Sequence, residues 1–160
     1  MTEKILSRWV RLVIILIAIC GVLICSLWVP MRIGGWSFNG QQVAIQGVEL
    51  WFQFVFHWVV SLPCFWILTI AWRITTDMKN GLLFTMENSV RVKHAAQVLF
   101  VSVLVFLVGN VIFAILKWNS ALMANCIVAV LGMVMSVLFA VLSHYLYRAA
   151  ELQEECDGTI

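Results

Sequence analysis

Residues 98–116 read VLFVSVLVFLVGNVIFAIL, and residues 121–142 read ALMANCIVAVLGMVMSVLFAVL. Each run is long enough to cross a hydrocarbon layer as a helix, which takes roughly 20 residues. Only KWNS separates the two runs, so they must form an antiparallel helical hairpin. Outward from this hairpin, residues 10–29 and 48–72 form two further apolar runs. The sequence therefore predicts an all-α membrane protein with four transmembrane helices.

The composition supports this class and excludes a water-soluble domain. The chain has 160 residues, of which 63% are hydrophobic and 11% charged, and its mean hydropathy is +1.01. The segments between the apolar runs are too short to fold around a core of their own. We therefore predict a single four-helix transmembrane bundle over residues 1–160, which ends in an acidic cytoplasmic tail at residues 149–160.

Positively charged residues are unevenly distributed around the four runs. An excess of Lys and Arg marks the cytoplasmic loops of multi-pass proteins. We therefore predict that both termini are cytoplasmic. The first run is expected to be a retained helix, because no small-residue cleavage motif follows it. The basic residues on the predicted inner side are Lys4, Arg8, Arg11, Arg73, Lys79, Arg91, Lys93 and Arg148, against Arg32 and Lys117 on the outer side.

The predicted outer connection between the first two helices contains GWSFNGQQVAI at residues 35–45. Asn39 and Gly40 both tolerate positive φ, and this pair is a strong signal for a two-residue β-hairpin turn. The sequence therefore predicts a short extracytoplasmic hairpin with one apolar face. Two interpretations remain open, a structural lid on the helices and a flap that senses a ligand.

A stripe of polar residues begins the second helix. Glu49, Gln53 and His57 follow one another at intervals of four residues, so they lie along one helix face. His57 is deep enough that it should face the other helices rather than lipid. These three residues are candidates for lining a cavity for a small ligand, an ion or a proton. The alternative is an interfacial carboxylate above a histidine that is satisfied by hydrogen bonds.

The third and fourth helices offer polar and small residues to one another. Counting outward from KWNS brings Asn110 and Asn125 to nearly the same depth, where their amides can bond. Gly132, Ser136 and Ala140 form a seam of small residues at four-residue spacing, which permits close helix packing. The sequence leaves open whether the helix against this seam belongs to the same chain or to another subunit.

The inner ends of these two helices should project beyond the membrane. Gly81 ends the preceding segment, Thr85 is a suitable N-cap, and no helix breaker occurs between Met86 and Leu116. The fourth helix continues in the same direction into AAELQEECDGTI. We predict a cytoplasmic stalk in which Arg91 and Lys93 lie opposite Glu151, Glu154, Glu155 and Asp157.

Two short motifs at this end resemble those of a known family. GLLFTMEN at residues 81–88 and the terminal AAELQEECDGTI are similar to the connector and tail signatures of the bacterial membrane proteins called domain of unknown function 2975. Gly81, Phe84, Thr85 and Asn88 match the first signature, and Ala149 or Ala150, Leu152, Glu155, Asp157, Thr159 and Ile160 match the second, with Gly158 in place of the usual Leu.

The resemblance implies a location and a partner. Members of that family are bacterial membrane proteins, often encoded beside a small helix-turn-helix regulator of the Cro repressor type. It therefore implies a protein of the bacterial plasma membrane that binds a transcription regulator at its cytoplasmic face. The residues expected to form the docking surface are Phe84, Thr85, Asn88, Arg91, Lys93, Leu152, Glu155 and Asp157.

Other functions compete with this regulatory role. An oligomeric channel or small transporter would use Glu49, Gln53 and His57, and an immunity protein against an extracellular peptide would use the outer face. We expect no enzyme, because the sequence has no nucleophile–base pair, metal motif or phosphate-binding loop. We likewise expect no cofactor and no direct binding of nucleic acid, since membrane orientation accounts for the basic residues.

Overall fold

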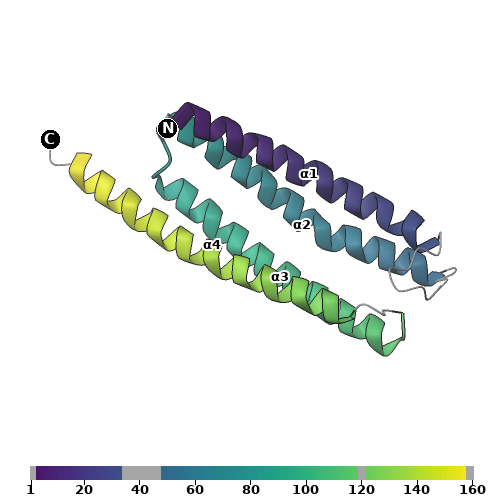
Figure 1. Cartoon of the computed structure of the whole chain (residues 1–160). Helices are drawn as coiled ribbons and strands as arrows, with labels where there is room; N and C mark the ends of the chain where they lie inside the picture. Colours follow the sequence, from purple (N-terminus) through teal and green to yellow (C-terminus); the bar gives the residue numbers. More distant parts are fainter. Residues whose placement is uncertain (1–2, 34–47, 119–121, 158–160) are drawn as a thin grey trace.

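The computed structural model describes residues 3–33, 48–118 and 122–157, and these form four long helices (Figure 1). The helices are α1 (Glu3–Ile33), α2 (Val48–Lys79), α3 (Met86–Ile115) and α4 (Leu122–Asp157). All four are long and apolar enough to cross a membrane. The predicted fold class, a multi-pass helical membrane protein, is confirmed to this extent.

The predicted β-hairpin around Asn39 and Gly40 falls in residues 34–47, which lie outside the described residues. No strand occurs in the described ranges. The structure therefore gives the predicted hairpin no support.

The helices form a row rather than a closed bundle. α1 packs against α2, α2 against α3 and α3 against α4, while the described part of α1 makes no contact with α3 or α4. Figure 1 shows the row as two antiparallel pairs side by side. The expectation of a four-helix bundle is corrected here. Lipid tails cover apolar helix faces as favourably as other helices do, so no hydrophobic force drives α1 and α4 together.

The α3–α4 interface is the most extensive and is lined with small polar residues. The Ser89 and Ser143 hydroxyls each donate to the other residue's carbonyl, both at 3.1 Å, and the Ser136 hydroxyl donates to the Ala96 carbonyl at 2.9 Å. The two sets of bonds are seven residues apart on both helices, the spacing of one heptad of a left-handed coiled coil. Hydroxyls that bond carbonyls across the interface let the two backbones approach closely.

The predicted seam and amide pair are found here within one chain. Asn125 Nδ2 donates to Asn110 Oδ1 at 2.5 Å, as predicted. Gly132 faces Val103, and a Cβ added at Gly132 would lie 2.6 Å from Val103 Cγ2. Ala140 is exposed and does not continue the seam.

The α1–α2 pair is joined by fewer polar contacts. A Cβ added at Gly21 would lie 3.3 Å from the ring of Phe65, and Cys25 Sγ lies 3.3 Å from Ser61 Oγ. Toward the other end, the Arg11 guanidinium donates to Thr76 Oγ1 at 3.1 Å.

The helices are antiparallel, so their ends gather on two opposite sides of the row. α1 begins and α4 ends at the same end as the connector between α2 and α3 (Figure 1). With 30 residues, α3 is about 45 Å long, more than a hydrocarbon core of roughly 30 Å requires. The prediction that α3 and α4 extend beyond the apolar layer at this end is consistent with their lengths.

Candidate functional site

The connector between α2 and α3 is a rigid turn. α2 ends in a Schellman motif, in which the Leu82 amide donates to the Asp77 carbonyl at 2.9 Å and the Gly81 amide donates to the Met78 carbonyl at 3.2 Å. Gly81 adopts φ +76°, a left-handed conformation that glycine adopts without steric cost. Thr85 then caps α3 by accepting the Asn88 amide at 3.3 Å. The predicted roles of Gly81 and Thr85 are confirmed.

Asn88 ties the connector together from inside. Its side chain is fully buried, with 0% of its surface exposed. Its Nδ2 donates to the carbonyls of Leu82 at 3.0 Å and Leu83 at 3.3 Å. Its Oδ1 accepts Arg91 Nη1 at 3.0 Å. Asn88 is therefore an internal support of the predicted docking surface and does not belong to its exterior.

Arg91 joins α3 to α2 instead of to the tail. Its Nη1 donates to Asp77 Oδ2 at 2.8 Å, and its Nη2 bonds the Glu87 carboxylate. The predicted pairing of Arg91 with the acidic tail is therefore corrected, because the carboxylates that Arg91 bonds are those of Asp77 and Glu87. Asp77 and Glu87 are nearer in the chain and are already held beside Arg91 by the turn and by helical spacing, so pairing with them immobilises less chain. We call Asp77, Asn88 and Arg91 the inner clasp.

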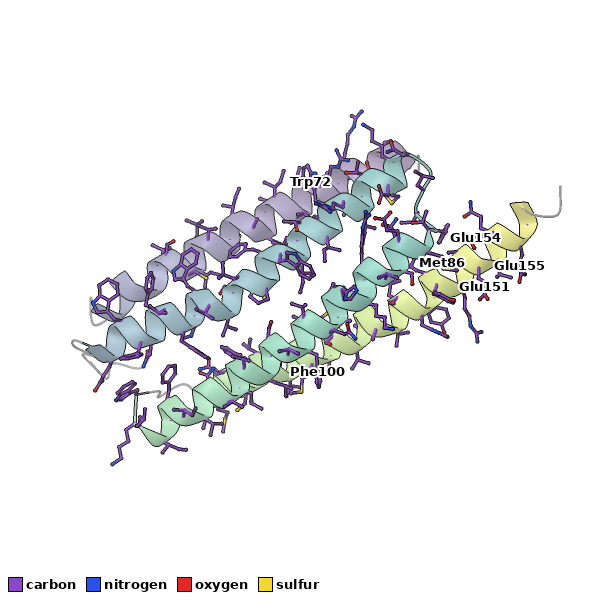
Figure 2. All side chains as sticks on the ribbon, turned by 180° about the vertical axis from the view of Figure 1, so that it is seen from behind. Trp72, Met86, Phe100, Glu151, Glu154 and Glu155 are labelled. Atoms are coloured by element: carbon purple, nitrogen blue, oxygen red, sulfur yellow. The ribbon has the colours of Figure 1, made fainter. Side chains whose placement is uncertain are left out.

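The end of α4 extends past this clasp and is exposed over residues 151–156. Ala150 is the last buried residue of α4, and Leu152 and Glu155 are exposed. Figure 2 shows Glu151, Glu154 and Glu155 beyond Met86, where α3 begins. Of the other predicted docking residues, Phe84 and Lys93 are exposed, and the Asp157 side chain lies outside the described residues.

At the opposite end of the row, a second polar contact joins α2 to α3. α3 also ends in a Schellman motif, with Lys117 at φ +61° and the Trp118 amide donating to the Phe113 carbonyl at 2.8 Å. The rings of Phe113 and Trp118 stack, with centroids 6.0 Å apart. Gln53, 5% exposed, donates from Nε2 to the Trp118 carbonyl at 2.6 Å. We call Gln53 and Trp118 the outer clasp.

Two residues of the predicted polar stripe, Gln53 and His57, pack against α3 and the turn that follows it. His57 faces α3, as predicted, with its ring in edge contact with Phe106. Its Nδ1 lies 2.7 Å from the Gln53 carbonyl, which can only accept, so Nδ1 carries the proton. Glu49 is half-buried. A shallow apolar hollow of about 470 Å³ lies nearby, but Phe56 and six α3 residues line it, and it includes none of the three stripe residues.

Replacing Gln53 by leucine should lower the free energy of unfolding by about 1 kcal/mol, because the part-buried Trp118 carbonyl loses its donor. Equilibrium unfolding in mixed detergent–SDS micelles measures this loss. Gln97→Leu, the same change at an exposed position of α3, is the control and should leave the stability unchanged. Equal effects of the two substitutions would contradict a clasp at Gln53.

Sequence reasoning missed Asp77, although a usable signal was present. Reflection about the 80–85 connector brings Asp77 to within about one helical turn of Arg91, much as reflection about KWNS brought Asn110 close to Asn125. The Trp118 carbonyl could not be foreseen, since its direction depends on the left-handed backbone of Lys117. No group of three metal-ligating side chains gathers in the described parts of the chain.

With this geometry in view, comparison with known proteins gives one result. A family model, described as protein of unknown function (DUF2975), matches residues 35–160. The chain belongs to the DUF2975 family. The resemblance noted at the connector and tail is thereby confirmed. No curated protein and no solved structure matches this DUF2975 chain.

Three of the four residues of the connector motif in this DUF2975 chain have a structural role at the turn between α2 and α3. Gly81 permits the turn, Thr85 caps α3, and Asn88 holds two connector carbonyls. Phe84 has no such role and is 48% exposed. An exposed aromatic ring on a rigid turn is available for contact with lipid or with a partner.

Proposed function

We propose that this DUF2975 protein is a non-enzymatic regulatory membrane protein that binds a cytosolic helix-turn-helix regulator. The observation that carries the proposal is the exposed end of α4. Residues 151–156 are helical and exposed, and they extend past the last packed residue of α4, Ala150. An exposed helix that combines Leu152 with three glutamates suits a partner with an apolar groove bordered by basic residues, and DNA-binding proteins are rich in surface basic residues.

The orientation required by the proposal follows from charge. The connector between α2 and α3 and the projecting end of α4 lie on the same side of the row. Four basic residues lie on this side, namely Arg8, Arg11, Lys79 and Arg91. By the positive-inside rule, this end faces the cytoplasm of a bacterial cell. A regulator bound there would be held at the membrane and kept from DNA.

The two clasps supply a route for a signal. They join the α1–α2 pair to the α3–α4 pair at both ends, and α4 touches only α3 among the described helices. A ligand that separated Gln53 from Trp118 at the outer end would change the packing of α3 against α2. Because α4 packs against α3, it would move with α3. Coupling between the two ends would require a second arrangement of the α3–α4 pair against α2, and ligand binding at the outer clasp would favour it.

Binding of a purified helix-turn-helix regulator of the Cro repressor type tests the proposal. The full-length protein, immobilised in detergent, should retain the regulator, and Leu152→Ala should weaken binding at least tenfold, because exposed apolar anchors dominate helix-in-groove interfaces. Leu131→Ala is a matched control, since Leu131 and Leu152 are 61% and 62% exposed on the same helix. Unaltered binding after deletion of residues 151–160, or equal losses in both leucine variants, would contradict the proposal.

A further inference from the structure

The first turns of α1 form an amphiphilic hollow outside both clasps. Ile5, Arg8, Trp9 and Leu12 line a shallow depression of about 280 Å³. Their spacing of three and four residues puts them on one helix face. All four are exposed, so this face is not covered by α2. The hollow thus has apolar walls and one guanidinium.

Its depth matches that of lipid headgroups. The apolar span of α1 begins at Ser7 and runs to Leu27, so Arg8 lies at the first turn of the span. Trp9 has the amphipathic ring that favours this interface. A lipid beside α1 would therefore meet Arg8 with its phosphate and Leu12 with its acyl chain. This holds whichever side of the membrane the end faces.

Among the described side chains, no carboxylate forms a salt bridge with Arg8 or Arg11. Arg11 lies one turn from Arg8, bonds Thr76 and stacks over Trp72, with its guanidinium carbon 5.1 Å from the ring centre. Its buried Nε has no hydrogen-bond partner among the described residues. The Arg11–Thr76 contact also brings Arg8 level with Lys79 in the antiparallel pair.

The described carboxylate that follows Thr76 in α2 is already paired with another arginine. Asp77 follows Thr76 directly but pairs with Arg91 of α3. Two guanidiniums one turn apart repel each other unless an anion lies between or beside them. The site therefore favours an anionic amphiphile over a zwitterionic one.

We propose that this face of α1 is a binding site for one anionic phospholipid, whose phosphate bonds Arg8 and whose acyl chain lies along Ile5, Trp9 and Leu12. The site is separate from the regulator-binding end of α4 and does not depend on the proposed function. α1 touches only α2 among the described helices, so the lipid would act as its second neighbour.

Native mass spectrometry of the full-length protein in neutral detergent tests the site. Dioleoyl phosphatidylglycerol should bind at least fivefold more tightly than dioleoyl phosphatidylcholine, which is the preference that one basic side chain gives at a membrane surface. Arg8→Gln should abolish the preference and Arg8→Lys should keep most of it. Because Arg8 is exposed, neither change removes a packing contact.

Arg73→Gln is the matched control. Arg73 is an exposed arginine of α2, one helical turn before Asp77, which bonds α3, so it lies away from the α1 hollow. This variant should keep the wild-type preference, and millimolar inorganic phosphate should not compete with the lipid. Equal binding of the two lipids to the wild type, an unchanged preference in Arg8→Gln, loss of preference in Arg73→Gln, or full competition by phosphate would each overturn the proposal.

Discussion

Replacing Asn88 by alanine is expected to lower the free energy of unfolding by about 3 kcal/mol, the largest loss that we expect from a single polar residue here. The Asn88 amide occupies a fully buried position between the Leu82 and Leu83 carbonyls and Arg91. Alanine removes the donor to the two connector carbonyls and one of the acceptors of Arg91. Equilibrium unfolding in detergent–SDS micelles measures the change.

Two further variants separate the contributions of Asn88. Asn88→Asp keeps an acceptor for Arg91 but has no donor for the two carbonyls, so most of the loss should persist. Asn80→Ala removes an exposed asparagine from the same connector and should cost no more than a few tenths of a kcal/mol. A loss in Asn80→Ala equal to that in Asn88→Ala would contradict the inner clasp.

Gly132→Val is expected to destabilise the α3–α4 pair by about 1–3 kcal/mol, through overpacking. Even a single added Cβ would lie 2.6 Å from Val103 Cγ2, which is closer than carbon atoms approach without displacement. Val103 cannot move aside easily, because β-branched side chains in helices have one strongly preferred rotamer. The same unfolding measurement applies.

A compensating substitution makes this prediction specific. Val103→Ala removes the carbon atoms that the new side chain would meet, so the double variant Gly132→Val/Val103→Ala should be more stable than Gly132→Val alone. Ala140→Val, at an exposed position of the same helix, should have little effect. Strict additivity of the two changes would show that Gly132 and Val103 do not pack as described.

Where the chain reverses within a few residues, the sequence predicts the packing well. The Asn110–Asn125 bond and the Thr85 cap follow from counting residues away from a short turn or from a local capping pattern. Helix geometry converts such counts directly into depth. His57 could likewise be assigned to the side of α2 facing other helices, because exposing its ring to lipid is costly.

Predictions that depended on choosing between partners were less successful. Arg91 had several carboxylates within reach by charge, and the pair it forms with Asp77 depends on a connector held by Asn88. Gln53 and His57 lie on one face, as their spacing indicates, yet the left-handed turn at Lys117 brings a carbonyl to Gln53 where a cavity was expected. Backbone direction at such turns is decided by packing that a single sequence does not display.

The single-file order of the helices also limits what one copy can conduct. Helices that touch only in sequence order surround no common axis, so the described part of one chain offers water no enclosed column across an apolar layer. A pore would need several copies arranged in a ring, each contributing one wall. Any ion flux through this protein is therefore expected to increase with the fraction of chains in ring-shaped oligomers. No flux is expected when the protein is monomeric.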